Sequence, residues 1–161
     1  MSLVDVTDDK VPFFSLKGLC CKCKVVNIHD GDTVRIVIQY PQETTSTTFA
    51  KFTCRMTGYD SPELASHSTD AYKATNVLAR YCLSENIFLD MNRHYSKTEF
   101  TQIFLQNKKI LDVQFHGEDK YGRQLVTLYE EGNKCINHEL MAYSFNLPYD
   151  GKGARPIHDT L

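Results

Sequence analysis

Apolar and polar residues alternate with a period of two in several stretches of the chain, which is the pattern of half-buried β-strands. Residues 24–28 lead into a polar turn at 30–33, and alternation resumes over 34–39. These runs predict a strand–turn–strand unit. A polar loop is predicted at 42–48, and a third strand over 49–59.

The third predicted strand has two distinct faces, because successive side chains of a strand point in opposite directions. Phe52, Cys54 and Met56 share one face, which we expect to face the core, and this leaves Arg55 on the opposite face. Two further runs alternate, namely Leu111, Val113 and Phe115, and Leu125, Thr127 and Tyr129. A short strand is predicted at 87–89, a loop at 117–123 and a turn at 131–133.

Helical spacing of apolar residues marks three other segments. Residues 68–84 form the longest of these, and Ser68 is suited to be the N-cap. A short helix is predicted over 98–106, and a C-terminal helix over 137–145 with Leu140, Met141 and Ser144 on one face. About five strands, with one helix inserted after the third and another at the end, predict an α+β protein built on a small closed OB-fold barrel.

The length of 161 residues fits one compact domain. Residues 1–17 lack periodicity and are predicted to form a flexible N-terminal arm, and residues 18–161 to form the domain. No apolar run is long enough to span a bilayer, and residues 1–10 lack the apolar stretch of a signal peptide. We therefore expect an intracellular, cytoplasmic protein that acts as a monomer without membrane association.

Charge and cysteine content narrow the function further. A net charge of −2 argues against a protein that coats nucleic acid through a broad basic surface, but not against an enzyme that holds one phosphate. The six cysteines are expected to be free thiols, with Cys54 and Cys82 in the core. Cys20, Cys21 and Cys23 have no second cluster to complete a metal site, so they are interpreted as small residues entering a strand.

Three short polar segments carry the candidate chemistry. They are Asp-Gly-Asp-Thr at 30–33, Arg55 followed by Asp-Ser-Pro-Glu at 60–63, and Asp-Lys-Tyr-Gly-Arg at 119–123. Each alone is more often structural, because Asp and Gly favour hairpin turns and a strand arginine is usually solvated. Their combination in this order is specific.

Together the three segments resemble the signature of the staphylococcal nuclease-like (thermonuclease) family, which runs D-G-D-T, R-x-x-x-x-D-T-P-E and D-K-Y-G-R. The resemblance covers residues 23–150, and the ending at 147–151 is similar to intracellular members from large DNA viruses and eukaryotes. It implies an OB-fold, calcium-dependent phosphodiesterase. Such a hydrolase acts as endonuclease and exonuclease on DNA and RNA, prefers single strands and leaves 3′-phosphates.

For the metal, the resemblance implies that Asp32 and Asp60 hold Ca²⁺ with the main-chain carbonyl of Ser61. Ca²⁺ favours hard oxygen ligands and tolerates irregular geometry, so these residue types suit it. Ser61 replaces the family's threonine, which leaves the carbonyl in place. The resemblance assigns Glu63 as the general base, and the residue could equally position the attacking water.

For the substrate, the resemblance implies that Arg55 and Arg123 bind the phosphate to be cut. Guanidinium groups remain protonated at any working pH and grip phosphoryl oxygens in a bidentate manner. They also stabilise the charge that develops in the transition state. Lys120 and Tyr121 would contact the neighbouring phosphate and nucleotide.

Several alternatives stay open. The domain could be a catalytically inactive OB-fold module that binds nucleic acid or a protein, although every side chain that inactive relatives typically lose is present. Residues 86–107 could form a flap near the nucleotide groove or a surface excursion, and we favour the excursion. Tyr143 and Tyr149 are candidates for stacking on a base or for packing. The six histidines lack metal-ligand spacing and are predicted at the surface.

Overall fold

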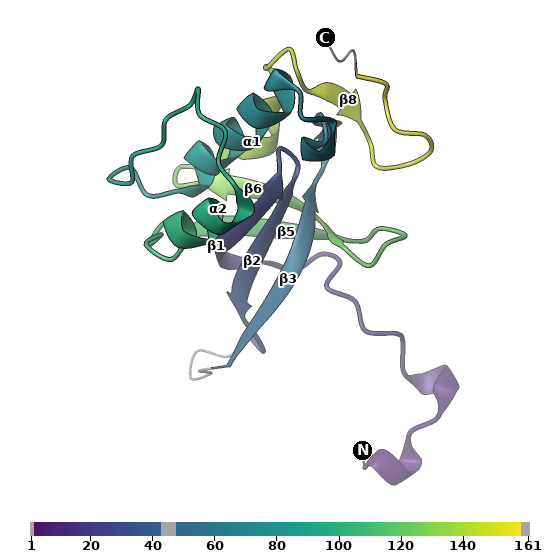
Figure 1. Ribbon diagram of the computed structural model, residues 1–161. Helices are drawn as coiled ribbons and strands as arrows, with labels where there is room; N and C mark the ends of the chain where they lie inside the picture. The colour runs from purple at the N-terminus through teal and green to yellow at the C-terminus, as the bar shows by residue number, and fades with distance from the viewer. Residues whose placement is uncertain (1, 43–47, 159–161) are drawn as a thin grey trace.

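The computed structural model describes residues 2–42 and 48–158 and shows a closed five-stranded β-barrel with helices packed around it (Figure 1). The barrel strands follow the order β3-β2-β1-β5-β6, and the short strand β7 lies at the edge beside β6. The strands are β1 (Cys20–Asp30), β2 (Thr33–Gln39), β3 (Phe49–Met56), β5 (Leu111–Glu118), β6 (Gln124–Glu130) and β7 (Lys134–Cys135). The predicted α+β class and OB-like barrel are confirmed.

The barrel closes where β3 pairs with β6 in parallel. The other strand pairs of this sheet are antiparallel. The parallel register sets Arg55 opposite Leu125. The segment that precedes β6 is thereby brought close to the end of β3, so two polar segments that are far apart in the sequence meet at this seam.

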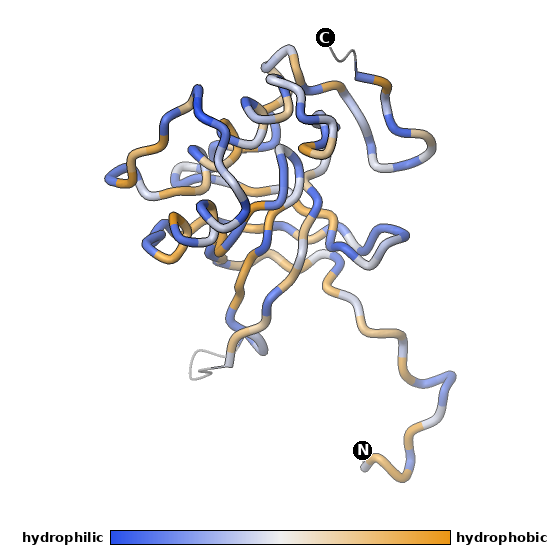
Figure 2. The backbone as a smooth tube through the Cα atoms, viewed as in Figure 1, coloured by the Kyte–Doolittle hydropathy of each residue, from blue (hydrophilic) through white to orange (hydrophobic). Residues whose placement is uncertain are grey.

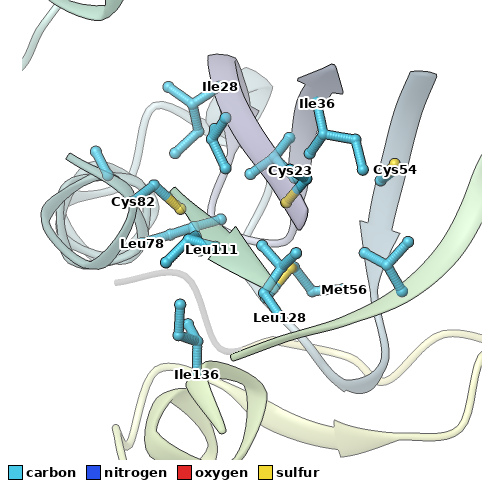
Figure 3. Close-up of a cluster of buried hydrophobic side chains, with 14 of the residues drawn as sticks. Cys23, Ile28, Ile36, Cys54, Met56, Leu78, Cys82, Leu111, Leu128 and Ile136 are labelled. Atoms are coloured by element: carbon cyan, nitrogen blue, oxygen red, sulfur yellow. The ribbon is translucent and has the colours of Figure 1, made fainter. Parts of the chain in front are cut away.

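The interior of the barrel is filled by alternating side chains of its strands. Figure 2 shows hydrophobic residues concentrated along the strands and hydrophilic residues on the β5–β6 loop. Cys54 and Cys82 are fully buried, as predicted. Burying one large aliphatic side chain stabilises a fold by about 1.5–3 kcal/mol. Figure 3 shows part of this core, in which the labelled residues are Cys23, Ile28, Ile36, Cys54, Met56, Leu78, Cys82, Leu111, Leu128 and Ile136.

Two helices are inserted between β4 and β5, where the predicted architecture had one. In α1 (Thr69–Cys82) the N-cap is Ser68, whose hydroxyl accepts the backbone N–H of Ala71 at 3.1 Å, as predicted. The second helix, α2 (Lys97–Phe104), matches the short helix predicted over 98–106. It begins with a capping box in which Ser96 and Glu99 exchange side-chain to backbone hydrogen bonds.

The strand predicted over 49–59 is interrupted after Met56. Gly58, with a φ of +96°, follows the interruption and begins β4 (Gly58–Asp60). This strand pairs with β8 (Leu147–Tyr149), which the sequence analysis did not predict because the segment carries a proline and little periodicity. The β4–β8 pair ties the C-terminal segment to the second polar motif.

Three smaller predictions are wrong. Residues 87–89 form no strand, and their alternating burial, with Phe88 exposed, arises in a loop. The C-terminal helix α3 (Ile136–Met141) is shorter than predicted, and only Leu140 of the predicted face is buried. On β6 the buried face consists of the complementary set to the one we singled out, namely Gln124, Val126 and Leu128.

The N-terminal residues extend away from the barrel (Figure 1) and contain two 3₁₀ turns, η1 (Leu3–Asp5) and η2 (Asp8–Lys10). Leu16 is buried against the core although it lies within the predicted arm. Of the loop predicted at 42–48, residues 43–47 lie outside the described residues. None of the helices in the described part of the chain has the length and apolar character that crossing a bilayer demands.

Candidate active site

One end of the barrel holds a cavity of about 1050 Å³. All three polar segments of the sequence contribute to its wall, and the C-terminal segment, in yellow in Figure 1, lies at the same end as the β1–β2 turn. Asp60 and Ser61 are fully buried behind the wall. The fold thus brings together the segments predicted to form the site, and the predicted site residues in the wall are Asp32, Arg55, Glu63, Lys120, Tyr121 and Arg123.

Arg55 links the two predicted metal aspartates. Its guanidinium lies 2.7 Å from Asp60 Oδ1 and 3.2 Å from Asp32 Oδ2, and only 5% of the residue is exposed. The expectation that Arg55 lies on the face away from the apolar set is consistent with this position. The residue is nevertheless buried, because two carboxylates compensate its charge and hold the guanidinium at the cavity wall.

The β1–β2 turn is packed too tightly for any residue but glycine at position 31. A Cβ on Gly31 would lie 2.7 Å from the Cβ of Ala74 and 2.8 Å from that of Ser61. The phenol of Tyr59 donates to the carbonyl of Gly31 at 2.8 Å, and the N–H of Ser61 donates to Asp32 Oδ2 at 3.0 Å. The Asp-Gly-Asp turn is therefore fixed against the segment that carries Asp60.

Asp30 is a functional candidate that the sequence analysis missed. It lines the cavity, and its Oδ1 accepts the backbone N–H of Asp32 at 3.2 Å. Burial, reinforced by the neighbouring Asp32 carboxylate, raises the pKa of Asp30 well above its usual range. The alternating aspartates of the turn were the signal that could have identified it, since a cation near both would relieve their repulsion.

The β5–β6 loop holds Arg123 through Asp119. The Asp119 carboxylate accepts the backbone N–H groups of Tyr121 at 2.8 Å and of Arg123 at 2.9 Å, and lies 2.7 Å from Arg123 Nε. Burial would raise the pKa of Asp119, but these hydrogen bonds outweigh it and the pKa is lowered. Gly122 permits the turn by adopting a φ of +80°. Asp119 therefore positions the guanidinium with its Nη groups available.

Lys120 and Tyr121 are exposed at the rim of the cavity. The ammonium of Lys120 lies 5.3 Å from the ring centre of Tyr121, and the guanidinium of Arg123 lies 5.4 Å from it. Tyr121 is 72% exposed, so one face of a large aromatic ring remains accessible beside the cations. Such a surface suits stacking on a base next to a phosphate contact.

The C-terminal segment supplies an arginine and a histidine, Arg155 and His158, that the sequence analysis missed. Arg155 contacts Asp60 Oδ1 through Nε at 2.9 Å and also bonds Glu63, and His158 Nε2 lies 2.8 Å from Asp60 Oδ2. Burial would raise the pKa of Asp60, but hydrogen bonds from Arg155, Arg55 and His158 lower it. No local motif marks Arg155 or His158, because only the β4–β8 pairing brings them here. The prediction that the histidines lie at the surface is wrong for His158.

The donor set is compatible with a hard divalent cation. Asp32 and Asp60 offer carboxylate oxygens close to a main-chain turn, and the buried hydroxyl of Ser61 has no hydrogen-bond partner among the described residues. Across residues 2–42 and 48–158 no three His, Cys, Asp or Glu side chains group closely enough to hold a metal by themselves. Waters and main-chain oxygens would have to complete the shell, which Ca²⁺ accepts readily.

Part of the segment at 86–107 lines the cavity. His94, Tyr95, Ser96 and Lys97 contribute to the wall, so the interpretation of this segment as a surface excursion is wrong for these residues. Burial of Tyr95 and the capping box before α2 fix this stretch in place. Residues 94–97 therefore form a part of the cavity wall separate from the part formed by the β5–β6 loop.

The two candidate stacking tyrosines have different positions. Tyr149 lines the cavity, and the Arg55 guanidinium lies 5.4 Å from the centre of its ring. Tyr143 instead stacks on Phe145, with the rings 5.3 Å apart and inclined by 19°. Tyr149 therefore belongs to the candidate site, whereas Tyr143 packs on Phe145 and does not line the cavity.

No protein-family model matches this chain, and no curated protein matches it either.

Proposed function

We propose that the protein is a calcium-dependent nuclease that hydrolyses phosphodiester bonds in single-stranded DNA and RNA and leaves 3′-phosphates. The observation that carries this proposal is the convergence of two guanidiniums and several carboxylates on one open cavity. Arg55 and Arg123 line it together with Asp32 and Glu63. The resemblance to the staphylococcal nuclease-like family leads to the same chemistry.

In the proposed reaction the arginines hold the phosphate and stabilise its developing charge. Arg123 offers its Nη groups because Asp119 engages Nε. Arg55 is fixed between two aspartates, so its orientation costs little when the substrate binds. Both side chains keep their charge through the reaction, because a guanidinium stays protonated in proteins.

Glu63 is the proposed general base, or the residue that positions the attacking water. The water oxygen forms a bond to phosphorus while its proton passes to the Glu63 carboxylate. The bond from phosphorus to the 5′-oxygen breaks, and this oxygen takes a proton from solvent. The Glu63 side chain is exposed and bonded only by Arg155 among the described residues, so it can exchange that partner for water.

Asp32 and Asp60 would hold the cation, with Asp30 close by and the Ser61 carbonyl as a further ligand. When bound, Ca²⁺ would lower the pKa of the attacking water and offset phosphate charge. A cation at this position would also relieve the mutual repulsion of Asp30 and Asp32.

The second candidate function is a catalytically inactive OB-fold module that binds nucleic acid. The contacts of Arg155 favour it, because they engage the proposed metal ligand Asp60 and the proposed base Glu63 together. A module of this kind would use the arginines and Tyr121 only to bind a strand.

The deciding experiment uses a fluorogenic single-stranded DNA oligonucleotide and its RNA counterpart, with excess Ca²⁺, with Mg²⁺ or with a chelator. We expect cleavage with Ca²⁺, poor turnover with Mg²⁺ and none with the chelator. The products should block polymerase extension until a phosphatase removes the 3′-phosphate. Binding without cleavage under all conditions would favour the inactive module, and undiminished cleavage in chelator would refute the calcium requirement.

A further inference from the structure

A second, smaller cavity adjoins the candidate active site. Its volume is about 310 Å³, and it shares three residues of its wall, His29, Lys97 and Arg123, with the larger cavity. The two cavities therefore adjoin each other at these three residues. None of the residues assigned to the proposed reaction, apart from Arg123, contributes to the smaller one.

The wall of the small cavity is basic. Arg35, Lys97 and Arg123 bring three permanent cations to it, and no aspartate or glutamate is among the described residues that line it. Burial, and the charges of Lys97, Arg123 and Arg35, lower the pKa of His29 against the opposing effect of Asp32, because these cations share a cavity wall with its imidazole.

The cations are positioned by regular structure. Arg35 is in the middle of β2, opposite Asn27 of β1 on one side and Thr53 of β3 on the other. Lys97 begins α2, which lies beside β1 (Figure 1). The side-chain amide of Asn27 donates to the hydroxyl of Thr101 at 3.2 Å and so links the helix to the strand.

Arg35 and Lys97 also have no carboxylate partner in the part of the chain that the structure describes. Both side chains are exposed, and no ion pair involves either of them within residues 2–42 and 48–158. The cavity adds neutral hydrogen-bonding groups from Asn27, Thr53 and Thr101. Cations without carboxylate partners, surrounded by amide and hydroxyl groups, are suited to an oxyanion.

We infer that this basic cavity is a subsite for a backbone phosphate of the nucleic-acid strand, adjacent to the phosphate held by Arg55 and Arg123. The inference rests on the proposed nuclease function for the identity of its ligand. Arg35 and Lys97 would bind the non-reacting phosphate, and Arg123 stands between the two positions. The strand would then cross β1 and β2 between α2 and the β5–β6 loop.

The first test measures binding without cleavage. Fluorescence anisotropy with a single-stranded DNA of about 12 nucleotides, a length within the range that one OB fold covers, is recorded in excess chelator over a salt series. We compare the wild type with Arg35→Gln/Lys97→Gln and with a matched control, Lys73→Gln/Lys108→Gln, whose lysines are exposed and line neither cavity. The first double variant should bind more weakly, and its slope of log K against log salt should be shallower by about 0.7, as expected for one lost phosphate contact to a single strand.

The second test identifies the ligand as a phosphate at a defined place. One neutral methylphosphonate linkage is moved along the oligonucleotide, and the position at which it weakens wild-type binding but not binding by Arg35→Gln/Lys97→Gln marks the subsite. Equal affinities and salt slopes for the wild type and this variant would overturn the inference. Neither binding test needs cleavage, so the subsite and the nuclease proposal can fail separately. If the wild type cleaves no oligonucleotide with Ca²⁺ but Arg35→Gln/Lys97→Gln still has the shallower slope of log K against log salt, the nuclease proposal is rejected and the subsite is kept.

Discussion

At the scale of single residues, the two arginines of the site differ in how firmly the fold depends on them. Arg55 is buried between Asp32 and Asp60, so its removal takes from the buried Asp32 its ion-pair partner and leaves Asp60 with Arg155. Arg123 is partly exposed and contacts one aspartate of its own loop. Loss of Arg55 therefore disturbs folding and chemistry together, whereas loss of Arg123 reports mainly on chemistry.

We predict that Arg123→Lys lowers the cleavage rate by about 10²–10³, because an ammonium cannot reproduce the two-point grip of a guanidinium on the phosphate. Its free energy of unfolding should change by less than about 1 kcal/mol, since the Asp119 contact is partly solvated. The cleavage rate, the oligonucleotide dissociation constant and urea unfolding are measured in parallel. Arg55→Lys serves for comparison and should also lose stability. Wild-type cleavage by Arg123→Lys would contradict its assigned role.

Asp119 leads to a prediction about pH. Its pKa is lowered in the folded state, so its carboxylate stabilises the protein above the unfolded value of about 3.9 and this contribution is lost as pH falls through the folded value. Asp119→Asn should therefore cost about 1 kcal/mol near pH 7, and this cost should vanish once the pH falls below the folded pKa of Asp119. Urea unfolding across pH measures this difference. Asp8→Asn, in the exposed N-terminal arm, should follow the wild-type profile, and a wild-type profile for Asp119→Asn would disprove the stabilising role.

At the scale of elements, periodicity and capping residues were sufficient to predict those helices and strands whose contacts are local in the sequence. Ser68 marked the start of α1, and the turn at 30–33 marked the hairpin of β1 and β2, because each signal lies within a few residues of the feature. The β4–β8 pair has no such signal. Its three-residue strands depend on tertiary contact, so the sequence pattern did not predict them. For the same reason it did not predict Arg155, which reaches Asp60 only because the β4–β8 pairing brings the C-terminal segment back to the site. The site motifs were visible in the sequence, but Arg155 and His158 were not.

The segment between α1 and β5 depends on one buried amide. Asn107 Nδ2 donates to the carbonyls of Val25 and Cys82 at 2.9 and 3.1 Å, and its Oδ1 accepts the N–H of Ser84 at 3.0 Å. Asn107→Ala should lower the free energy of unfolding by about 2–4 kcal/mol, because several buried backbone groups lose their partner. Chemical denaturation measures this, with the exposed Asn86→Ala as control. A loss below about 1 kcal/mol would show that the segment is held by packing instead.

In the proposed site, the C-terminal segment would compete with the cation for Asp60. Because Arg155 occupies oxygens of both Asp60 and Glu63, Arg155→Gln should tighten Ca²⁺ binding by about two- to fivefold, the range that a partly exposed ion pair supplies. Titration calorimetry with Ca²⁺ and no nucleic acid measures this directly. Lys152→Gln removes the same charge from the cavity wall without an ion pair to Asp60, and should have a smaller effect. Weaker Ca²⁺ binding by Arg155→Gln would contradict the competition.

At the scale of the whole molecule, the cysteines divide into classes by depth. Cys23 in β1, Cys54 in β3 and Cys82 in α1 are buried in the core that joins these elements, and burial raises the pKa values of Cys54 and Cys82 to about 12. Cys20 is exposed and Cys135 half-buried at the barrel surface. Since the thiolate is the reactive form, the core thiols should react only when the barrel opens.

We therefore predict that a thiol reagent near pH 8 modifies Cys20 first, the half-buried Cys21 and Cys135 more slowly, and the three core thiols at one common rate. A common rate is expected because a closed barrel leaves no strand that can detach alone, so these thiols share the global unfolding event. Mass spectrometry after timed labelling resolves each site, and full denaturation should expose all six free thiols. If Cys82 instead reacted well before Cys23 and Cys54, α1 would open separately from the barrel, and the active-site end that packs on it would open with it.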